Sequence, residues 1–456
     1  MNTAEKLLAN STVVAPSLTR LLALKAEAAA LIGRYDHVTR LPNRLQFIDD
    51  FPALAAPTRG PRLLIMVTLA EAKHYNEILR ALGHAFAEAF VRAGATALAA
   101  HLPPDAEIYH VSVLSLAFAI DHANADAVPG MVKSVAGAFS GALLVNDIPI
   151  KTKVGVGLLS LEPDAEPAEV LRAALAAAQD SRRGEEGWAW YNHRSDAAHI
   201  RAFRILADLP GAIGASDQLS LHFQPRIDLQ SGHCIGAEAL IRWKHPELGA
   251  VSPVDFIPLA EQTALIGPLT DWVLETALRQ ASQLLKAGRR LRISVNASPI
   301  NLSEPGFDEK LLRLCAEHSV GPDLMEVEFT EGTLAGNLDR ATAQLNRIRS
   351  AGVEVAIDDF GSGFANLNYL TTIPADVLKI DQSFIRPLGS ATGSEFLVRQ
   401  IVDIARGLNF RVCAEGIETA ATYDFLRGLG CDEGQGFFMA RPMPAAELGA
   451  WLAARD

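Results

Sequence analysis

The segment VAIDDFGSGFANLNYL, residues 355–370, is the part of the sequence on which the fold of the second half depends. An apolar run ends in two adjacent acids, Asp358 and Asp359, and glycines follow. Because successive side chains on a strand point to opposite faces, both carboxylates can reach one site only if the strand breaks at Asp359. Gly361 and Gly363 permit such a break. In isolation, an acid pair before glycines is also a common turn signal, so the segment needs its context.

The context is a repeated alternation of short β-rich runs and helical stretches after about residue 219. The runs are LSLHFQP, CIGAEALIRW, RISVNAS, MEVEFTE, VEVAIDD, VLKID, FRVCAEG and GQGFFM. Repeated strand–helix units of this kind predict an α/β fold with a TIM-like (β/α)₈ barrel. Barrels of this type place their chemistry at the carboxyl ends of the strands.

The remaining sequence divides into three parts. Residues 1–34 are predicted to be a helical lead-in, and residues 35–195 alternate strand-like and alanine-rich helical segments, which predicts a smaller α/β domain. Residues 196–218 are polar, then helical, then loop-like, and we interpret them as a linker to the barrel at 219–456.

Composition excludes several classes of protein. The chain is 49% hydrophobic with a net charge of -12, which argues for a globular protein and against one that binds a nucleic-acid polymer. The four cysteines are scattered, which fits a reducing compartment, and we expect a cytoplasmic protein. No long apolar stretch is free of charge, so no membrane association is expected.

Most of the predicted strands end in an oxygen-bearing or cationic side chain. These residues are Glu238, Asn296, Glu328, Asp358, Asp359, Lys379, Glu415 and Gln435. Carboxylates that converge in a partly dry pocket repel one another unless cations intervene, and Mg²⁺ or Mn²⁺ prefer oxygen ligands. A centre with two such ions is suited to phosphoryl displacement. Taken singly, however, an acid at a strand end is usually a solvated cap, and spacing alone leaves both readings open.

The motifs along the second half resemble those of the EAL domain, a family of cyclic diguanylate phosphodiesterases. The name-giving triplet is Glu238-Ala239-Leu240, and the other motifs follow in the family's order. These are QP, VNAS, EVEFTE, DDFGSGFANLNYL, LKID, AEGIE and GQGFF. The resemblance implies a TIM-like barrel, a homodimer, and hydrolysis of cyclic di-GMP to linear 5'-pGpG with two Mg²⁺ or Mn²⁺ ions.

The resemblance also implies a role for each motif residue. Metal ligands would be Glu238, Asn296, Glu328, Asp358, Asp359, Glu415 and Gln435, with Asp358 reaching both ions. Lys379 would contact the attacking water or the scissile phosphate, and the proton acceptor, Glu415 or Lys379 or neither, stays open. Substrate contacts would come from Gln224, Arg242, Asp381 and Glu418, and Glu331 would steady the loop after the paired acids.

Residues 35–195 resemble, more weakly, the GGDEF domain of diguanylate cyclases, through YDHVTRLPNR at its start. The signature loop would fall at Ser112–Leu116, which has neither the glycine pair nor an acid, and the metal-binding strand end reads Thr68-Leu69-Ala70. We therefore expect no cyclase activity. A regulatory or dimerising module, with weak GTP binding as a further possibility, and a purely structural remnant are the alternatives.

Two departures from the EAL pattern are visible, Arg226 after QP in place of the more usual uncharged residue and Ser362 in place of threonine. Neither removes an expected metal ligand. The alternative to an active enzyme is a catalytically silent receptor that binds cyclic di-GMP and signals through a partner.

Overall fold

The computed structural model describes residues 33–103, 106–121, 128–182, 184, 186–330, 338–361, 370–389 and 393–455. It divides into two compact units, Met1–His199 and Ile200–Asp456. The division falls within helix α7 (His193–Gly214). Most of the predicted lead-in, residues 1–32, lies outside the described residues.

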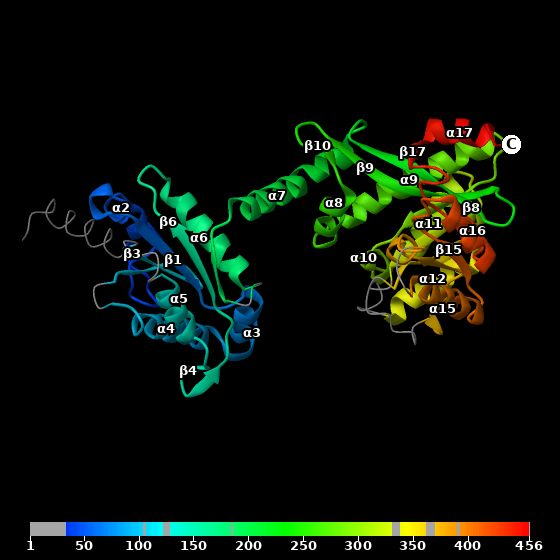
Figure 1. Cartoon of the computed structure of the whole chain (residues 1–456). Coiled ribbons are helices and arrows are strands. Elements are labelled where there is room, and N and C mark those ends of the chain that lie inside the picture. The colour runs from blue at the N-terminus through cyan, green and yellow to red at the C-terminus, as the bar shows by residue number, and fades with distance from the viewer. Residues whose placement is uncertain are drawn as a thin grey trace, which may run out of the picture. The chain divides into compact units, whose positions relative to one another are not determined.

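The first unit is built on a five-stranded sheet (Figure 1). In sheet order its strands are β2 (Ile108–Ser112), β3 (Ser115–Asp121), β1 (Arg62–Thr68), β6 (Gly155–Ser160) and β7 (Trp188–Trp190). The central strand β1 is antiparallel to both β3 and β6, and its side chains are almost all buried. The continuous run VSVLSLAFAI is therefore not one strand, because the chain turns at Val113 and Leu114 between β2 and β3.

Helices cover both faces of this sheet. They are α2 (Arg44–Leu54), α3 (Ala72–Leu82), α4 (His84–Ala99), α5 (Val128–Gly137) and α6 (Pro167–Ser181). Alternate residues of β1 explain the two layers, since Leu64 and Met66 pack with α2 and α6 whereas Leu63 and Ile65 pack with α3, α4 and α5. A small hairpin of β4 (Leu143–Val145) and β5 (Ile148–Ile150) completes the unit.

The second unit contains a closed eight-stranded barrel, which confirms the fold expected from the sequence. Around the ring the strands are β8 (Leu219–Asp228), β9 (Cys234–His245), β11 (Arg292–Asn296), β12 (Met325–Thr330), β13 (Glu354–Phe360), β14 (Val377–Ile380), β15 (Arg411–Ala414) and β16 (Glu433–Gly434). The helices around them are α8 (Pro253–Glu261), α9 (Ile266–Lys286), α10 (Pro299–Ser303), α11 (Phe307–Glu317), α12 (Leu338–Ser350), α14 (Gln382–Ile385), α15 (Ser394–Gly407), α16 (Ala420–Leu429) and α17 (Ala445–Ala453). Two short strands, β10 (Gly249–Val251) and β17 (Met443–Pro444), extend the sheet beside β9 and β8.

One strand departs from a regular (β/α)₈ barrel. Strand β8 is antiparallel to both of its neighbours, β9 and β16. The reason is local, because only five residues separate β8 from β9 and a parallel crossover needs a dozen or more. A turn forms instead, in which the Asp228 carboxylate accepts from the backbone N–H groups of Gln230 and Ser231 and Gly232 adopts φ 75°.

The sequence MEVEF on β12 shows how the barrel separates an apolar layer from a charged one. Met325, Val327 and Phe329 are buried in the cluster shared with the helices. Glu326 and Glu328 alternate with them and are completely buried, so they point into the barrel interior. The interior of this barrel is therefore ionic near the strand ends. No helix within the described part of the chain is both long and apolar enough to cross a bilayer.

Candidate active site

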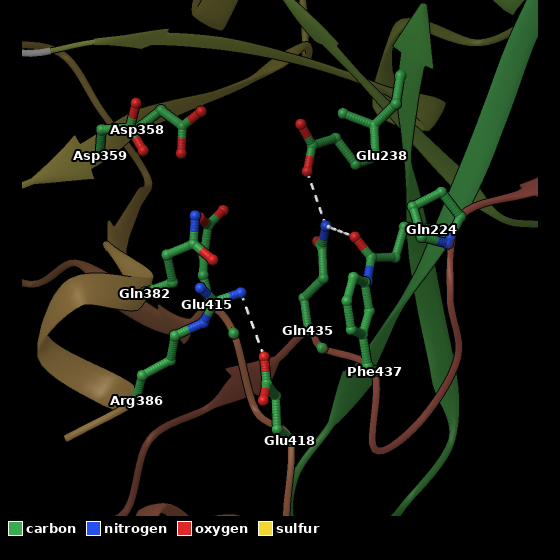
Figure 2. Close-up of a pocket in the computed structure, with 14 residues that line it drawn as sticks. Gln224, Glu238, Asp358, Asp359, Gln382, Arg386, Glu415, Glu418, Gln435 and Phe437 are labelled. Atoms are coloured by element: carbon green, nitrogen blue, oxygen red, sulfur yellow. Dashed lines mark hydrogen bonds and ion pairs between the residues drawn. The ribbon is translucent and has the colours of Figure 1, made fainter. Parts of the chain in front are cut away.

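A pocket of about 300 Å³ opens at the carboxyl ends of the barrel strands (Figure 2). Its lining includes residues expected from the sequence, namely Gln224, Glu238, Asp358, Asp359, Glu415, Glu418 and Gln435. These side chains come from β8, β9, β13 and the segments after β15 and β16. The barrel thus brings together residues that the sequence separates by about two hundred positions.

Lys379 on β14 lies at the base of this acidic site and is fully buried. Its Nζ is 2.8 Å from Glu328 Oε2 and 2.9 Å from Asp358 Oδ1. Glu415 Oε1 is 2.7 Å away and Glu238 Oε2 is 3.6 Å away. These carboxylates hold the pKa of Lys379 well above its ordinary value against the opposing effect of burial, so the ammonium stays charged.

The two adjacent acids reach the site because β13 is irregular at its end. The pairing of β13 with β14 shifts between Ile357 and Phe360, and Asp359 has a left-handed φ of 51°. Such a backbone is strained for a residue other than glycine, and strain of this kind is concentrated at functional sites. As a result, carboxylate oxygens of Asp358, Asp359 and Glu415 lie within 4.8 Å of one another.

Amide side chains fix the orientation of Glu238. Asn296 Nδ2 donates to Glu238 Oε1 at 3.0 Å, and Gln435 Nε2 donates to Glu238 Oε2 at 2.7 Å. Gln435 Nε2 also donates to Gln224 Oε1, and Gln224 Nε2 donates to the Ala440 carbonyl. Figure 2 shows this chain of contacts running from Gln224 to Glu238. Both oxygens of Glu238 are thereby held in place.

Burial makes several of these carboxyls hard to ionise. It raises the pKa of Glu415 to about 8, with the charges of Asp358 and Glu238 acting in the same direction and Lys379 opposing them. Burial also raises the pKa of Asp359 to about 6, helped by Asp358 and Asp381, and raises that of Glu328 well above its ordinary value. A bound cation would therefore stabilise the ionised form of these carboxyls.

The donor set fits divalent cations with oxygen ligands. Glu238, Glu328 and Asp358 form a second group whose oxygens lie within 4.8 Å of one another. Glu328 Oε1 and Gln435 Oε1 are buried and accept no hydrogen bond from any residue that the structure describes. Buried acceptors without a donor are costly, and a hard cation would satisfy them.

Other residues predicted from the sequence lie beside this pocket. Arg242 lines an adjoining pocket of about 310 Å³, which meets the first at Leu240. Asp381 caps α14 by accepting from Ser383 N and also bonds with Asp359. Glu331 lies outside the described residues, as does the segment 362–369 that it was expected to steady.

The sequence analysis missed three lining residues, Gln382, Arg386 and Phe437 (Figure 2). Arg386 Nη2 is 3.2 Å from Glu418 Oε1, and the guanidinium of Arg441 lies 4.2 Å from the centre of the Phe437 ring. Phe437 could have been found from its place two residues after Gln435. The positions of Gln382 and Arg386 depend on the short helix α14, which no pattern in the sequence indicates.

In the first unit, the strand end that would bind metal in a cyclase is closed by an arginine. Arg182 Nη2 donates to the carbonyls of Thr68 at 3.0 Å and Ala70 at 2.7 Å. Its Nε donates to the Lys153 carbonyl. A fixed cation therefore lies at the end of β1, where Thr68, Leu69 and Ala70 supply no carboxylate side chain.

Comparison with known proteins identifies both units. The EAL domain family matches residues 206–442, and the diguanylate cyclase, GGDEF domain, family matches residues 34–186. The cyclic di-GMP phosphodiesterase PA2567 of Pseudomonas aeruginosa is 36% identical over 419 residues, which cover 91% of this chain and 71% of that protein. The bifunctional diguanylate cyclase/cyclic di-GMP phosphodiesterase MucR of the same species is 30% identical over 454 residues, covering 98% and 65%.

Solved structures agree with this assignment. The PaMucR phosphodiesterase in its c-di-GMP complex is 40% identical with a TM-score of 0.51, covering 54% of this chain and 99% of that one. The EAL enzyme Bd1971, in a form with cAMP and cyclic-di-GMP bound, is 26% identical with a TM-score of 0.54, covering 67% and 82%. The chain therefore belongs to the EAL-domain family of cyclic di-GMP phosphodiesterases and carries a GGDEF-family domain ahead of its EAL domain.

Proposed function

We propose that this chain hydrolyses cyclic di-GMP to linear 5'-pGpG with two Mg²⁺ or Mn²⁺ ions held at the barrel mouth. The observation that carries the proposal is the charge of the site. Four carboxylates, those of Glu238, Glu328, Asp358 and Glu415, pair with the ammonium of Lys379, and Asp359 adds a fifth beside Asp358 and Glu415. When all are ionised the surplus is four negative charges, which two divalent cations would neutralise.

The acids divide between the two ions. Glu238, Glu328 and Asp358 would hold one ion with the oxygens of Asn296 and Gln435, and Asp358, Asp359 and Glu415 would hold the other. Bound there, the two cations would acidify a shared water and neutralise charge on the phosphoryl oxygens of an in-line displacement. Asp358 belongs to both groups and would bridge them.

The remaining residues would position groups and move protons. Lys379 Nζ lies against Asp358 and Glu415, which line the pocket, and would contact the attacking water or the attacked phosphate. Glu415, whose pKa is raised to about 8, is suited to exchange a proton near neutral pH. Because the ammonium of Lys379 stays protonated, Glu415 rather than Lys379 would accept the proton of the water.

The pocket walls fit a guanine dinucleotide. Arg242 offers a guanidinium fork for a phosphate, and Gln224 and Glu418 line the pocket with hydrogen-bonding groups. Asp381 lies behind Asp359 at the start of α14. The exposed ring of Phe437 offers a face on which a base can stack. The adjoining pocket at Arg242 gives room for the second half of the ring.

We also propose that the first domain is not a cyclase. The carbonyls at the end of β1 are already bonded to Arg182, and the β2–β3 turn carries no acid to bind metal. Incubation of the full chain with GTP and Mg²⁺ should give no cyclic dinucleotide by chromatography. Formation of cyclic di-GMP would contradict this, whereas retention of GTP without turnover would point to regulation by weak GTP binding.

A homodimer and a cytoplasmic location complete the proposal. Helix α15 exposes Phe396, Leu397 and Ile404 at 64%, 50% and 37% of their surface, an apolar strip that a second copy could cover. The four cysteines are free thiols, as a reducing compartment such as the cytoplasm would keep them.

The test incubates purified full-length protein with cyclic di-GMP and either Mn²⁺ or excess chelator, and separates the products by chromatography. The proposal predicts linear pGpG with Mn²⁺ and none with chelator. Tight binding of cyclic di-GMP without any product would support the silent receptor instead.

A further inference from the structure

Beneath the acids of the active site lies a second set of charges that has no part in the proposed chemistry. Arg226 on β8 is 1% exposed, and its Nη1 and Nη2 bond both oxygens of Glu326 at 2.5 and 2.6 Å. Its Nε is 2.9 Å from Glu433 Oε2. Ser294 Oγ donates to Glu326 Oε1 at 3.0 Å, so this carboxylate is held on several sides.

The set continues as a chain of ion pairs among residues at or near the amino-terminal ends of the strands. Arg411 Nη1 is 2.8 Å from Glu433 Oε1, and Arg411 also pairs with Glu354. Arg292 Nη2 is 2.6 Å from Glu354 Oε1. Three arginines thus face three glutamates, and this lower set, Arg226, Arg292, Arg411, Glu326, Glu354 and Glu433, is electrically balanced without any bound ion.

Arg226 stands at the boundary between the two sets. Its Nη1 lies 3.7 Å from Glu328 Oε1, while Glu328 Oε2 bonds Lys379 Nζ at 2.8 Å. Glu326 and Glu328 share one face of β12, two residues apart. After the effect of Arg226, the positive charge of Lys379 also contributes to lowering the pKa of Glu326. Without Arg226, Glu326 would be a buried carboxylate that has lost its partner. Arg292 and Arg411 stay engaged by Glu354 and Glu433, and the ammonium of Lys379 is the cation toward the strand ends that also acts on Glu326.

We propose that Arg226 is a positioning residue for the reaction. It pairs with Glu326 and so leaves Lys379 to pair with the four carboxylates of the active site, Glu238, Glu328, Asp358 and Glu415. Lys379 then holds Glu328 and Asp358 in the arrangement that receives the cations. The proposal rests on the proposed function in one respect, that the upper acids bind divalent metal.

The test compares Mn²⁺ binding, followed by electron paramagnetic resonance, in the wild-type chain, in Arg226→Met and in Arg226→Met/Glu326→Gln. Arg226→Met should weaken Mn²⁺ binding by about tenfold or more, the size seen when partners behind metal ligands are lost. The direction of the change in Mn²⁺ affinity is informative. Loss of the positive charge of Arg226 removes a repulsion, which by itself would tighten Mn²⁺ binding, whereas the proposal predicts weaker binding. The double variant also removes the charge of Glu326, while Glu433 keeps its pair with Arg411, and it should recover most of the wild-type affinity for Mn²⁺.

A metal-free crystal structure of Arg226→Met provides the second readout, which does not depend on metal binding or turnover. Lys379 Nζ should lie within hydrogen-bond distance of Glu326 and should have left Asp358 or Glu415. Arg427→Met is the matched control, since it removes an exposed pair with Asp424 on α16 and should leave Mn²⁺ binding unchanged.

The inference is overturned if Arg226→Met binds Mn²⁺ as tightly as wild type, or if the double variant is no better than the single one. It is also overturned if Lys379 keeps its four contacts in the variant crystal. If wild type itself binds no Mn²⁺ while Lys379 moves as expected in the variant, the proposed function fails and the role in metal binding with it, and only the placement of Lys379 by Arg226 stands.

Discussion

At the residue scale, Lys379 is the cation around which the carboxylates of the site are arranged. In the run VLKID a lysine would more often be exposed, yet its side chain is completely buried among four carboxylates. Its membership of the site was predictable from its position at a strand end. Its surroundings were not, because burial depends on how neighbouring strands in the ring align. The same holds for Arg226, whose partners lie on β12 and β16.

Replacement of Asp359 by asparagine should remove one ligand of the second cation while the side chain keeps its shape. We expect turnover of cyclic di-GMP to fall by about a thousandfold, since metal charge stabilisation is worth several kcal/mol. Circular dichroism and the melting temperature should stay near wild type, because the carboxyl that is removed is destabilised by burial. Near-normal turnover of cyclic di-GMP would show that Asp359 is not a ligand of the second cation.

The pH dependence of metal binding follows from the raised pKa values of Glu415, about 8, and Asp359, about 6. A carboxyl whose pKa is higher in the folded state than in the unfolded state contributes stability to the fold. That contribution is complete below the unfolded pKa and is lost as the pH rises through the folded pKa. Metal ions compete with the protons bound to Glu415 and Asp359. The apparent affinity for Mn²⁺ should therefore rise with pH below pH 8, by up to about tenfold per pH unit for each proton that the metal displaces.

The measurement is the rise in melting temperature caused by Mn²⁺, which should be larger at pH 8.5 than at pH 6.0. Glu415→Gln should reduce that difference because its amide binds no competing proton. An equal Mn²⁺ effect at both pH values in the wild-type chain would show that these carboxyls do not compete with the metal.

At the element scale, the end of β13 decides whether two adjacent acids can serve one site. From the sequence, we predicted a break in the strand at Asp359 that Gly361 and Gly363 would permit. The structure places the left-handed residue at Asp359 itself, with φ 51°, and Gly361 follows at φ 93°. The run of apolar residues predicted the strand, but backbone conformation at its end depends on contacts with α14, which the sequence did not reveal.

Gly361→Ala tests this element. A Cβ at this position would lie 2.6 Å from Phe384 Cε2, and the backbone is in a region unfavourable to alanine. We expect the free energy of unfolding to fall by about 1–3 kcal/mol, and turnover to fall because Asp359 is displaced. Urea unfolding and hydrolysis assays measure the two effects.

Gly449→Ala on α17 is the matched control, because no atom lies within 4 Å of the added Cβ. It should leave turnover unchanged and stabilise the helix by up to about 1 kcal/mol. If Gly361→Ala behaved like this control, the geometry at the end of β13 would not be what positions Asp359.

For the whole molecule, the barrel was predictable because strand-like runs alternated with helical stretches and most runs carried a polar residue near the carboxyl end. The antiparallel β8 was not foreseen, although the short connection of five residues between β8 and β9 could have indicated it. The run GQGFFM was predicted to be a strand, but only Gly434 of it lies in one, the two-residue β16 (Glu433–Gly434). A strand that short is fixed by pairing with its neighbours and leaves almost no periodic signal.

The oligomeric state gives a prediction at this scale. If α15 forms the proposed dimer contact, Phe396→Ser/Leu397→Ser should convert a dimer of the full chain into a monomer by light scattering coupled to gel filtration. Val254→Ser, at a separate exposed position on α8, is the control and should leave the dimer intact. A wild-type chain that is monomeric at all concentrations, or a dimer unaffected by the double change, would exclude this interface.

The central claim is that a surplus of four negative charges at the barrel mouth binds two divalent cations for hydrolysis of cyclic di-GMP. The most direct measurement is the number of Mn²⁺ ions bound per chain at pH 8.5, counted by electron paramagnetic resonance titration of metal-free protein. The account predicts two ions with the spectrum of a magnetically coupled pair, and one ion in Asp359→Asn. A single uncoupled ion, or none, in the wild-type chain would contradict it.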